Sequence, residues 1–240
     1  MKNTEQIKQF NVLQIILYHL LPGVPVLLAA VVFTNPVWGF GLPIFLSLMI
    51  SFCLCLIPSQ WLILVITARR EGKKTRDIIG YSSKMPLSKT LLWSLPGIVL
   101  AAVIFTVGID IENPLWRVFL WVPEWFRVNR PAPDMGNYVA LTLALNFLIR
   151  GLLVPFIEEI YFRGFLLPRM NRLGKSAPIA SAALFSVNHL FAPWENVTRM
   201  LAVLPFVYIT WHKKNVRISL ISHCTVNTLS CFMLLMSVRV

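Results

Sequence analysis

The sequence has few charged residues and very few acidic ones. Only 13% of its 240 residues are charged, and 10 are Asp or Glu against 22 Lys or Arg. A soluble globular domain is nearer to about 25% charged, whereas 57% of this chain is hydrophobic. This composition excludes an ordinary soluble domain and predicts a polytopic membrane protein. The net charge of +12 does not indicate nucleic-acid binding, because no basic soluble domain is present to carry it.

Sequence patterns typical of several other protein classes are missing. Disulfide frameworks and zinc sites place Cys or Cys/His pairs in polar loops, but all four cysteines lie inside apolar runs, at Cys53, Cys55, Cys224 and Cys231. There is no HExxH motif and no internal repeat of the kind that many transporters have. The first apolar run is too long for a cleavable signal peptide and lacks a cleavage site, so we expect it to remain as a membrane span.

Long apolar stretches fill most of the chain. A span needs about 20 apolar residues, and we expect seven spans, at about residues 12–33, 37–67, 90–109, 137–167, 177–192, 197–211 and 218–238. Residues 115–127 carry Trp residues beside charges, which suits a membrane–water interface. The predicted fold is therefore all-α, a transmembrane helix bundle of about seven spans plus a short interfacial helix.

The basic residues predict the orientation of the bundle. With the N-terminus in the cytoplasm, the cytoplasmic segments hold 15 of the 22 Lys and Arg residues, the outer segments hold 5, and two lie within a span. Cytoplasmic loops of membrane proteins carry such an excess. We also expect one integrated membrane domain in two parts, residues 1–136 with the first spans and residues 137–240 with the polar spans.

Two adjacent carboxylates interrupt the fourth predicted span, Glu158 and Glu159. A charge at the bilayer centre costs from about 3 to above about 10 kcal/mol, so these residues need a reason to be there. Glu159 and Arg163 are spaced i, i+4 on one helix face and can form an ion pair. Glu158 points about 100° away and needs another partner. An unpaired buried carboxylate can serve as a general base.

Candidate partners occur in two later spans. The fifth span carries Phe185 and His189, and the seventh carries His223 and Asn227 at i, i+4. At a rise of about 1.5 Å per residue, Glu158 and these polar residues lie roughly 8 to 18 Å from the cytoplasmic ends of their spans. The sequence therefore predicts one layer of polar groups on the cytoplasmic side of the midplane, with Phe185 packed beneath it.

Three motifs in this order resemble the CAAX protease and bacteriocin-processing (CPBP, or Abi) family of intramembrane glutamic endopeptidases, which includes the Ras-converting CAAX peptidases. The motifs are Glu158-Glu159-x-x-x-Arg163, Phe185-x-x-x-His189 and His223-x-x-x-Asn227. The resemblance covers residues 137–235 and makes 137–240 the catalytic part. It implies that Glu158 activates water with the help of His189. It also implies that His223 and Asn227 stabilise the oxyanion, that Glu159 and Arg163 support the site as an ion pair, and that no metal or cofactor takes part.

The expected substrate is a membrane-associated peptide or protein, and the resemblance allows prenylated CAAX tails, pheromone precursors and bacteriocin leaders. The site would open toward the cytoplasm, at the cell membrane of a prokaryote or the endoplasmic reticulum of a eukaryote. Three alternatives remain open. They are a zinc protease with Glu158, His189 and His223 as ligands, a proton-coupled transporter, and a non-catalytic immunity or scaffold protein.

Overall fold

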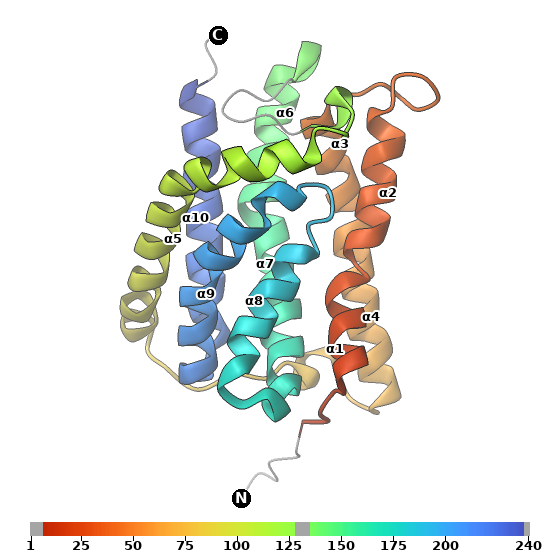
Figure 1. Ribbon diagram of the computed structural model, residues 1–240. Coiled ribbons are helices and arrows are strands. Elements are labelled where there is room, and N and C mark those ends of the chain that lie inside the picture. Colours follow the sequence, from red (N-terminus) through yellow and green to blue (C-terminus); the bar gives the residue numbers. More distant parts are fainter. Residues whose placement is uncertain (1–6, 128–134, 238–240) are drawn as a thin grey trace, which may run out of the picture.

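The protein is a bundle of helices (Figure 1). The structure, a computed structural model, describes residues 7–127 and 135–237. Within these residues every element is helical, apart from one isolated bridge between Ser82 and Asn215. Five segments are long and apolar enough to cross a membrane: Val12–Thr34, Ile44–Arg70, Leu87–Gly108, Val139–Val187 and Val216–Met236. The predicted all-α integral membrane fold is confirmed, but the count of about seven spans is not.

Proline shapes the first two spans. Helices α1 (Val12–Leu20) and α2 (Gly23–Thr34) are separated at Pro22. The second span begins at Ile44 rather than near residue 37, because residues 35–43 form a loop that ends at Pro43. It contains α3 (Ile44–Ser51), a π-helical turn η1 (Phe52–Leu56) and α4 (Ile57–Arg70). The π turn lies just before Pro58, whose missing N–H interrupts the helical ladder.

Helix α5 (Leu87–Trp116) rises along the bundle and then crosses its upper end in Figure 1. It follows a short 3₁₀ turn, η2 (Thr75–Ile78). The helix predicted over residues 115–127 is wrong in detail. The chain there contains the end of α5 and two 3₁₀ turns, η3 (Arg117–Phe119) and η4 (Glu124–Phe126), and Pro123 prevents a continuous helix. The Trp116 ring lies 4.4 Å from that of Trp194, so this segment packs onto the turn between α8 and α9.

In Figure 1 the C-terminal half of the chain runs down the bundle, then up, then down, and then up again. It begins with η5 (Gly136–Tyr138), α6 (Val139–Leu145), the π segment η6 (Asn146–Leu153), α7 (Val154–Glu158) and the π segment η7 (Glu159–Leu166). It reverses in η8 (Leu167–Ser176), where Gly174 has φ 54°, a value that glycine adopts without strain. The remaining elements are α8 (Ala177–Val187), η9 (Pro193–Glu195), α9 (Asn196–Lys213) and α10 (Val216–Ser237).

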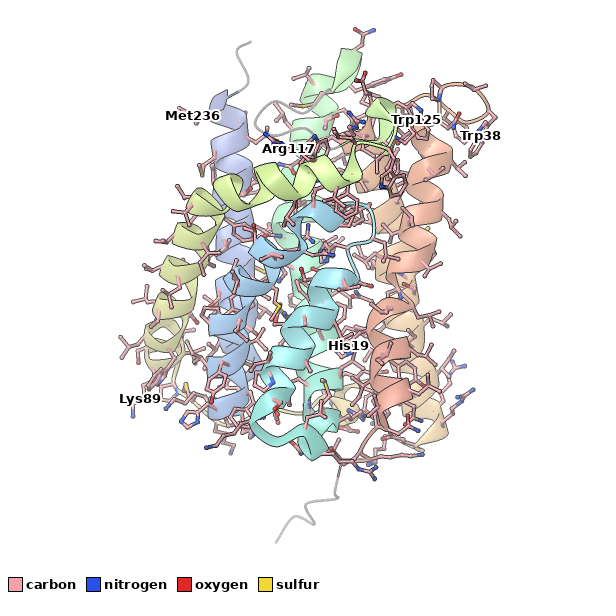
Figure 2. All side chains as sticks on the ribbon, viewed as in Figure 1. His19, Trp38, Lys89, Arg117, Trp125 and Met236 are labelled. Carbon is pink, nitrogen blue, oxygen red and sulfur yellow. The ribbon has the colours of Figure 1, made fainter. Side chains whose placement is uncertain are left out.

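The two ends of the bundle differ in chemistry. Figure 2 places Lys89 at the lower end, and it places Trp38, Arg117, Trp125 and Met236 at the upper end. The lower end also carries the turns after α4, at η8 and between α9 and α10 (Figure 1). Because these turns are rich in Lys and Arg, we call this end the basic end. Which membrane side it faces stays a prediction. Three of the cations counted for orientation, Lys2, Arg130 and Arg239, lie outside the described residues.

Candidate active site

Glu159 is the centre of a buried polar cluster. Its Oε1 atom lies 3.1 Å from a terminal nitrogen of Arg163, and neither side chain is exposed. The expected ion pair is therefore present. The same Oε1 atom accepts a hydrogen bond of 2.8 Å from Nδ1 of His223 on α10. Because the carboxylate accepts, Nδ1 carries the proton and Nε2 on the opposite side of the ring is left for another group.

Phe185 packs against the charged and aromatic members of this cluster. Its ring lies 4.2 Å from the guanidinium carbon of Arg163, a cation–π distance. It also meets the rings of His189 and His223 edge-on, at 4.9 and 5.8 Å. The Phe206 ring on α9 stacks on His223 at 5.8 Å. Phe185 is 1% exposed, so it fits the expected packing role beneath the polar groups.

His189 lies outside a helix, contrary to the predicted span over residues 177–192. Helix α8 ends at Val187 and His189 follows in the turn. The helix can end there because Nδ1 of His189 donates to the carbonyl of Phe185 at 2.9 Å, replacing one of the missing backbone donors. With Nδ1 protonated, Nε2 faces the Oε1 atom of Glu158 at 3.9 Å. This distance is too long for a direct hydrogen bond.

Glu158 borders a small cavity. The side chain is 2% exposed, and its Oε1 atom has no hydrogen-bond partner among the described residues. The cavity has a volume of about 20 Å³, and Glu158, Asn188 and His189 line it together with Phe191 and residues of α2, η1 and α7. Room for one water requires about 10–15 Å³ and polar partners. The cavity therefore has the size and polarity that one water molecule needs.

The first two spans help to build this site. Gly23 lies so close to Asn188 that an added Cβ would be 2.1 Å from the Asn188 carbonyl oxygen. The hydroxyl of Tyr161 donates to the carbonyl of Tyr18 at 2.6 Å. His19, labelled in Figure 2, is fully buried, with its ring 5.5 Å from that of Phe162. These N-terminal residues could not be predicted as part of the site from the sequence, because single small or polar residues in a span form no motif.

Asn227 is placed differently from the other predicted residues. Its side-chain amide donates to the backbone carbonyl of Arg150 at 3.0 Å, and this contact ties α10 to η6. A primary amide has two N–H donors, so one hydrogen bond leaves a second donor. The structure brings Glu158 to His189 and Glu159 to both Arg163 and His223. Within the part of the chain that the structure describes, the Asn227 side chain makes no hydrogen bond to any of these residues.

A second buried ion pair was missed. Arg199 of α9 donates to Oε2 of Glu195 at 2.6 Å, and their side chains are each 8% exposed. Arg199 lies within electrostatic range of Glu158 and His189. The i, i+4 spacing that Glu195 and Arg199 share with Glu159 and Arg163 was the available signal.

Within residues 7–127 and 135–237, no group of three or more His, Cys, Asp or Glu side chains is arranged to hold a metal ion. The fold and the cluster together define an integral membrane protein with a buried Glu/His site.

The family model of Rce1-like type II CAAX prenyl endopeptidases matches residues 140–229. The matched segment contains Glu158, Glu159, Arg163, Phe185, His189, His223 and Asn227. The predicted resemblance to the CAAX protease family is thereby confirmed. At the level of the family, the match indicates an endopeptidase and a membrane-associated protein substrate. The comparisons with curated proteins and with solved structures found no match.

Proposed function

We propose that the protein is an intramembrane endopeptidase of the glutamate type that hydrolyses a peptide bond without a metal ion or other cofactor. One observation carries this proposal. The buried Oε1 atom of Glu158, without a hydrogen-bond partner among the described residues, borders a cavity of about 20 Å³ and lies 3.9 Å from Nε2 of His189. A water between these two acceptors would be held for attack on a carbonyl carbon.

In the first step, Glu158 accepts a proton from the water as the water oxygen bonds to the carbonyl carbon. The carbonyl π electrons move to its oxygen, which becomes an oxyanion. His189 orients the water through the lone pair of Nε2, because its Nδ1 proton is held by the Phe185 carbonyl. In the second step, the C–N bond breaks and the proton on Glu158 passes to the leaving amine.

The oxyanion needs donors aimed at the place where its charge develops. Nε2 of His223, when protonated, and the second N–H of Asn227 serve as these donors. Glu159 contributes indirectly: it holds the imidazole of His223 by the hydrogen bond of 2.8 Å and stabilises a positive charge on the ring. Arg163 in turn fixes the position of Glu159.

The substrate class follows from the family match and the setting of the site. A substrate of this family is membrane-associated, and we propose a lipidated peptide of the prenylated CAAX type that reaches the site from the cytoplasm. The excess of basic residues at the end of the bundle near Lys89 (Figure 2) supports a cytoplasmic position for that end.

The test uses detergent-purified protein and a panel of prenylated and unprenylated peptides, with cleavage followed by mass spectrometry. Wild type should cleave a prenylated peptide, and Glu158→Ala should not. Equal inertness of both proteins toward every peptide would contradict catalysis. A second arm treats the enzyme with a strong chelator while its metal content is measured. Unchanged activity is expected, whereas loss on chelation with rescue by zinc would establish the metal-dependent alternative.

A further inference from the structure

The segment between η2 and α5 folds over the turn between α9 and α10 at the basic end. The backbone N–H of Val216 donates to the Tyr81 carbonyl at 2.8 Å, and that of Ser83 donates to the Lys214 carbonyl at 3.0 Å. The amide of Asn215 donates to the Ser83 carbonyl at 3.0 Å. Tyr81 and Lys214 have positive φ angles of 55° and 53°, a conformation that non-glycine residues adopt only when their surroundings hold them. The two segments therefore form a fixed clasp.

An open groove of about 460 Å³ runs along this clasp, lined by residues 81–86 and 215–217. Its volume lies within the range of about 300–1,000 Å³ that small-molecule sites occupy. The lining includes the hydroxyls of Ser82 and Ser83 and the cations of Lys84 and Arg217. Both cations are exposed, and neither charged group pairs with another side chain in the described part of the chain. The Ser83 hydroxyl already donates to the Lys213 carbonyl at 2.9 Å. The groove thus offers positive charge and the Ser82 hydroxyl to a ligand.

The charge around the groove has a single sign. Residues 81–93 and 211–224 contain five basic residues, Lys84, Lys89, Lys213, Lys214 and Arg217, and no acidic residue. Lys213 already lies over the Trp93 ring at 3.7 Å, and Lys214 lies over the Tyr81 ring at 4.6 Å. Lys213 and Lys214 are thus engaged by aromatic rings, and of the five cations Lys84 and Arg217 are the two that line the groove and can meet a ligand. Charge complementarity requires this ligand to be an anion.

A row of exposed apolar side chains on α5 begins at one side of the groove. Helix α5 begins at Leu87, directly after the groove residue Pro86, and exposes Leu87, Leu91 and Leu95 by 66%, 46% and 54%. Residues four apart lie on one helix face. Helix α5 is also a candidate membrane span from Leu87 to Gly108, and Figure 2 shows Lys89 at its lower end. The anion site is thus continuous with a surface that faces hydrocarbon, as a phospholipid requires.

We propose that this groove binds an anionic glycerophospholipid, with the phosphate headgroup between Lys84 and Arg217 and one acyl chain along Leu87, Leu91 and Leu95. The bound lipid would join the start of α5 to the start of α10. This site is separate from the proposed protease site, and its test requires no substrate.

The test measures lipid retention by native mass spectrometry on the full chain in detergent, titrated with phosphatidylglycerol or phosphatidylcholine. Wild type should retain one phosphatidylglycerol in preference to phosphatidylcholine. The variant Lys84→Ser/Arg217→Gln should lose about 30-fold in affinity, from about fivefold per cation near a membrane surface. The matched control Arg70→Gln/Lys175→Gln removes the same charge from exposed residues of the same end and should bind as wild type does. Equal losses in the two variants would overturn the site in favour of a diffuse surface potential.

Two further arms distinguish the sources of the anion. The variant Leu91→Asn should weaken phosphatidylglycerol binding severalfold and leave any binding of inorganic phosphate unchanged. If inorganic phosphate competes as well as the lipid and Leu91→Asn has no effect, the groove recognises a free anion and the lipid proposal fails. If a hexaglutamate peptide binds and phosphatidylglycerol does not, the groove serves an acidic protein segment, which also overturns the proposal. All variants change exposed side chains, and unfolding curves recorded without lipid verify that they fold.

Discussion

His223 and Glu159 share a buried hydrogen bond of 2.8 Å between Nδ1 and Oε1, and the same Oε1 atom lies 3.1 Å from Arg163. One carboxylate oxygen therefore connects a histidine of α10 to the arginine of η7. This connection separates the two adjacent glutamates. Glu159 contacts the Arg163 guanidinium and the Nδ1–H of His223, whereas Oε1 of Glu158 borders the cavity and lacks a hydrogen-bond partner among the described residues. The two residues should respond differently to the same substitution.

For Glu158→Gln, we expect the rate of peptide cleavage to fall by about 10²–10⁴-fold, the usual contribution of a general base. Stability should not fall, because the amide replaces a buried group that makes no ion pair shorter than the 3.9 Å contact with His189. Initial rates and unfolding curves in detergent measure the two effects. Glu124→Gln, at a side chain that is 92% exposed, is the control. A Glu158→Gln enzyme with more than a tenth of wild-type activity would exclude Glu158 as the base.

For Glu159→Gln, we expect a large loss of stability, about 3–5 kcal/mol, because the substitution leaves the buried charge of Arg163 uncompensated. The measurement is the free energy of unfolding in mixed micelles. A second variant, Glu159→Gln/Arg163→Met, removes both charges and should recover much of that loss, since an apolar replacement of a buried pair is often neutral. If the single variant is as stable as wild type, the ion pair does not support the fold.

Some contacts of this site could be predicted from the sequence and others could not. The i, i+4 spacing of Glu159 and Arg163 correctly predicted their ion pair, because both residues lie on one continuous helical segment. The hydrogen bond between His223 and Glu159 joins residues 64 positions apart. No spacing rule reaches across such a distance, so the sequence predicted a polar layer that includes His223 but could not predict its hydrogen bond to Glu159.

The position of His189 illustrates a second limit. Its span appeared continuous to residue 192 because residues 190–192 are apolar. The helix ends earlier because the His189 side chain, rather than a backbone N–H, donates to the Phe185 carbonyl. The periodicity of apolar residues does not predict which donor a carbonyl will have. The pair of Glu195 and Arg199 was missed for a related reason, since charged residues in a turn and in the helical turn after it predict exposure unless the packing around them is known.

For Asn227→Ala, we expect two separable losses. The hydrogen bond to the Arg150 carbonyl, at 3.0 Å, should contribute about 1 kcal/mol to stability. Loss of an oxyanion donor should lower kcat by about 10²–10³-fold. Thr228→Ala is the matched control, since the Thr228 hydroxyl donates to the Gly151 carbonyl at 3.3 Å between the same two elements. It should lose stability and keep its rate. Equal rates in the two variants would show that Asn227 only joins helices.

For Gly23→Ala, we expect a loss of both stability and activity, because the new Cβ would lie 2.1 Å from the backbone oxygen and 2.8 Å from the side-chain oxygen of Asn188. Backbone cannot yield locally, so α2 must move away from the end of α8. Overpacking of this kind costs about 1–3 kcal/mol. The movement would also distort the cavity, which Gly23, Asn188 and Glu158 line together. We therefore expect kcat to fall more than tenfold in the peptide cleavage assay.

The control for Gly23→Ala is Gly151→Ala, another substitution of a helical glycine in the bundle. There the nearest atom to the new Cβ would be Sγ of Cys231 at 3.4 Å, an ordinary contact. Replacing a helical glycine by alanine without strain stabilises a protein by about 0.4–1 kcal/mol, so Gly151→Ala should unfold slightly later and cleave at the wild-type rate. If Gly23→Ala behaves in the same way, the close approach of α2 to Asn188 does not shape the site, and the first spans do not help to form the cavity beside Glu158.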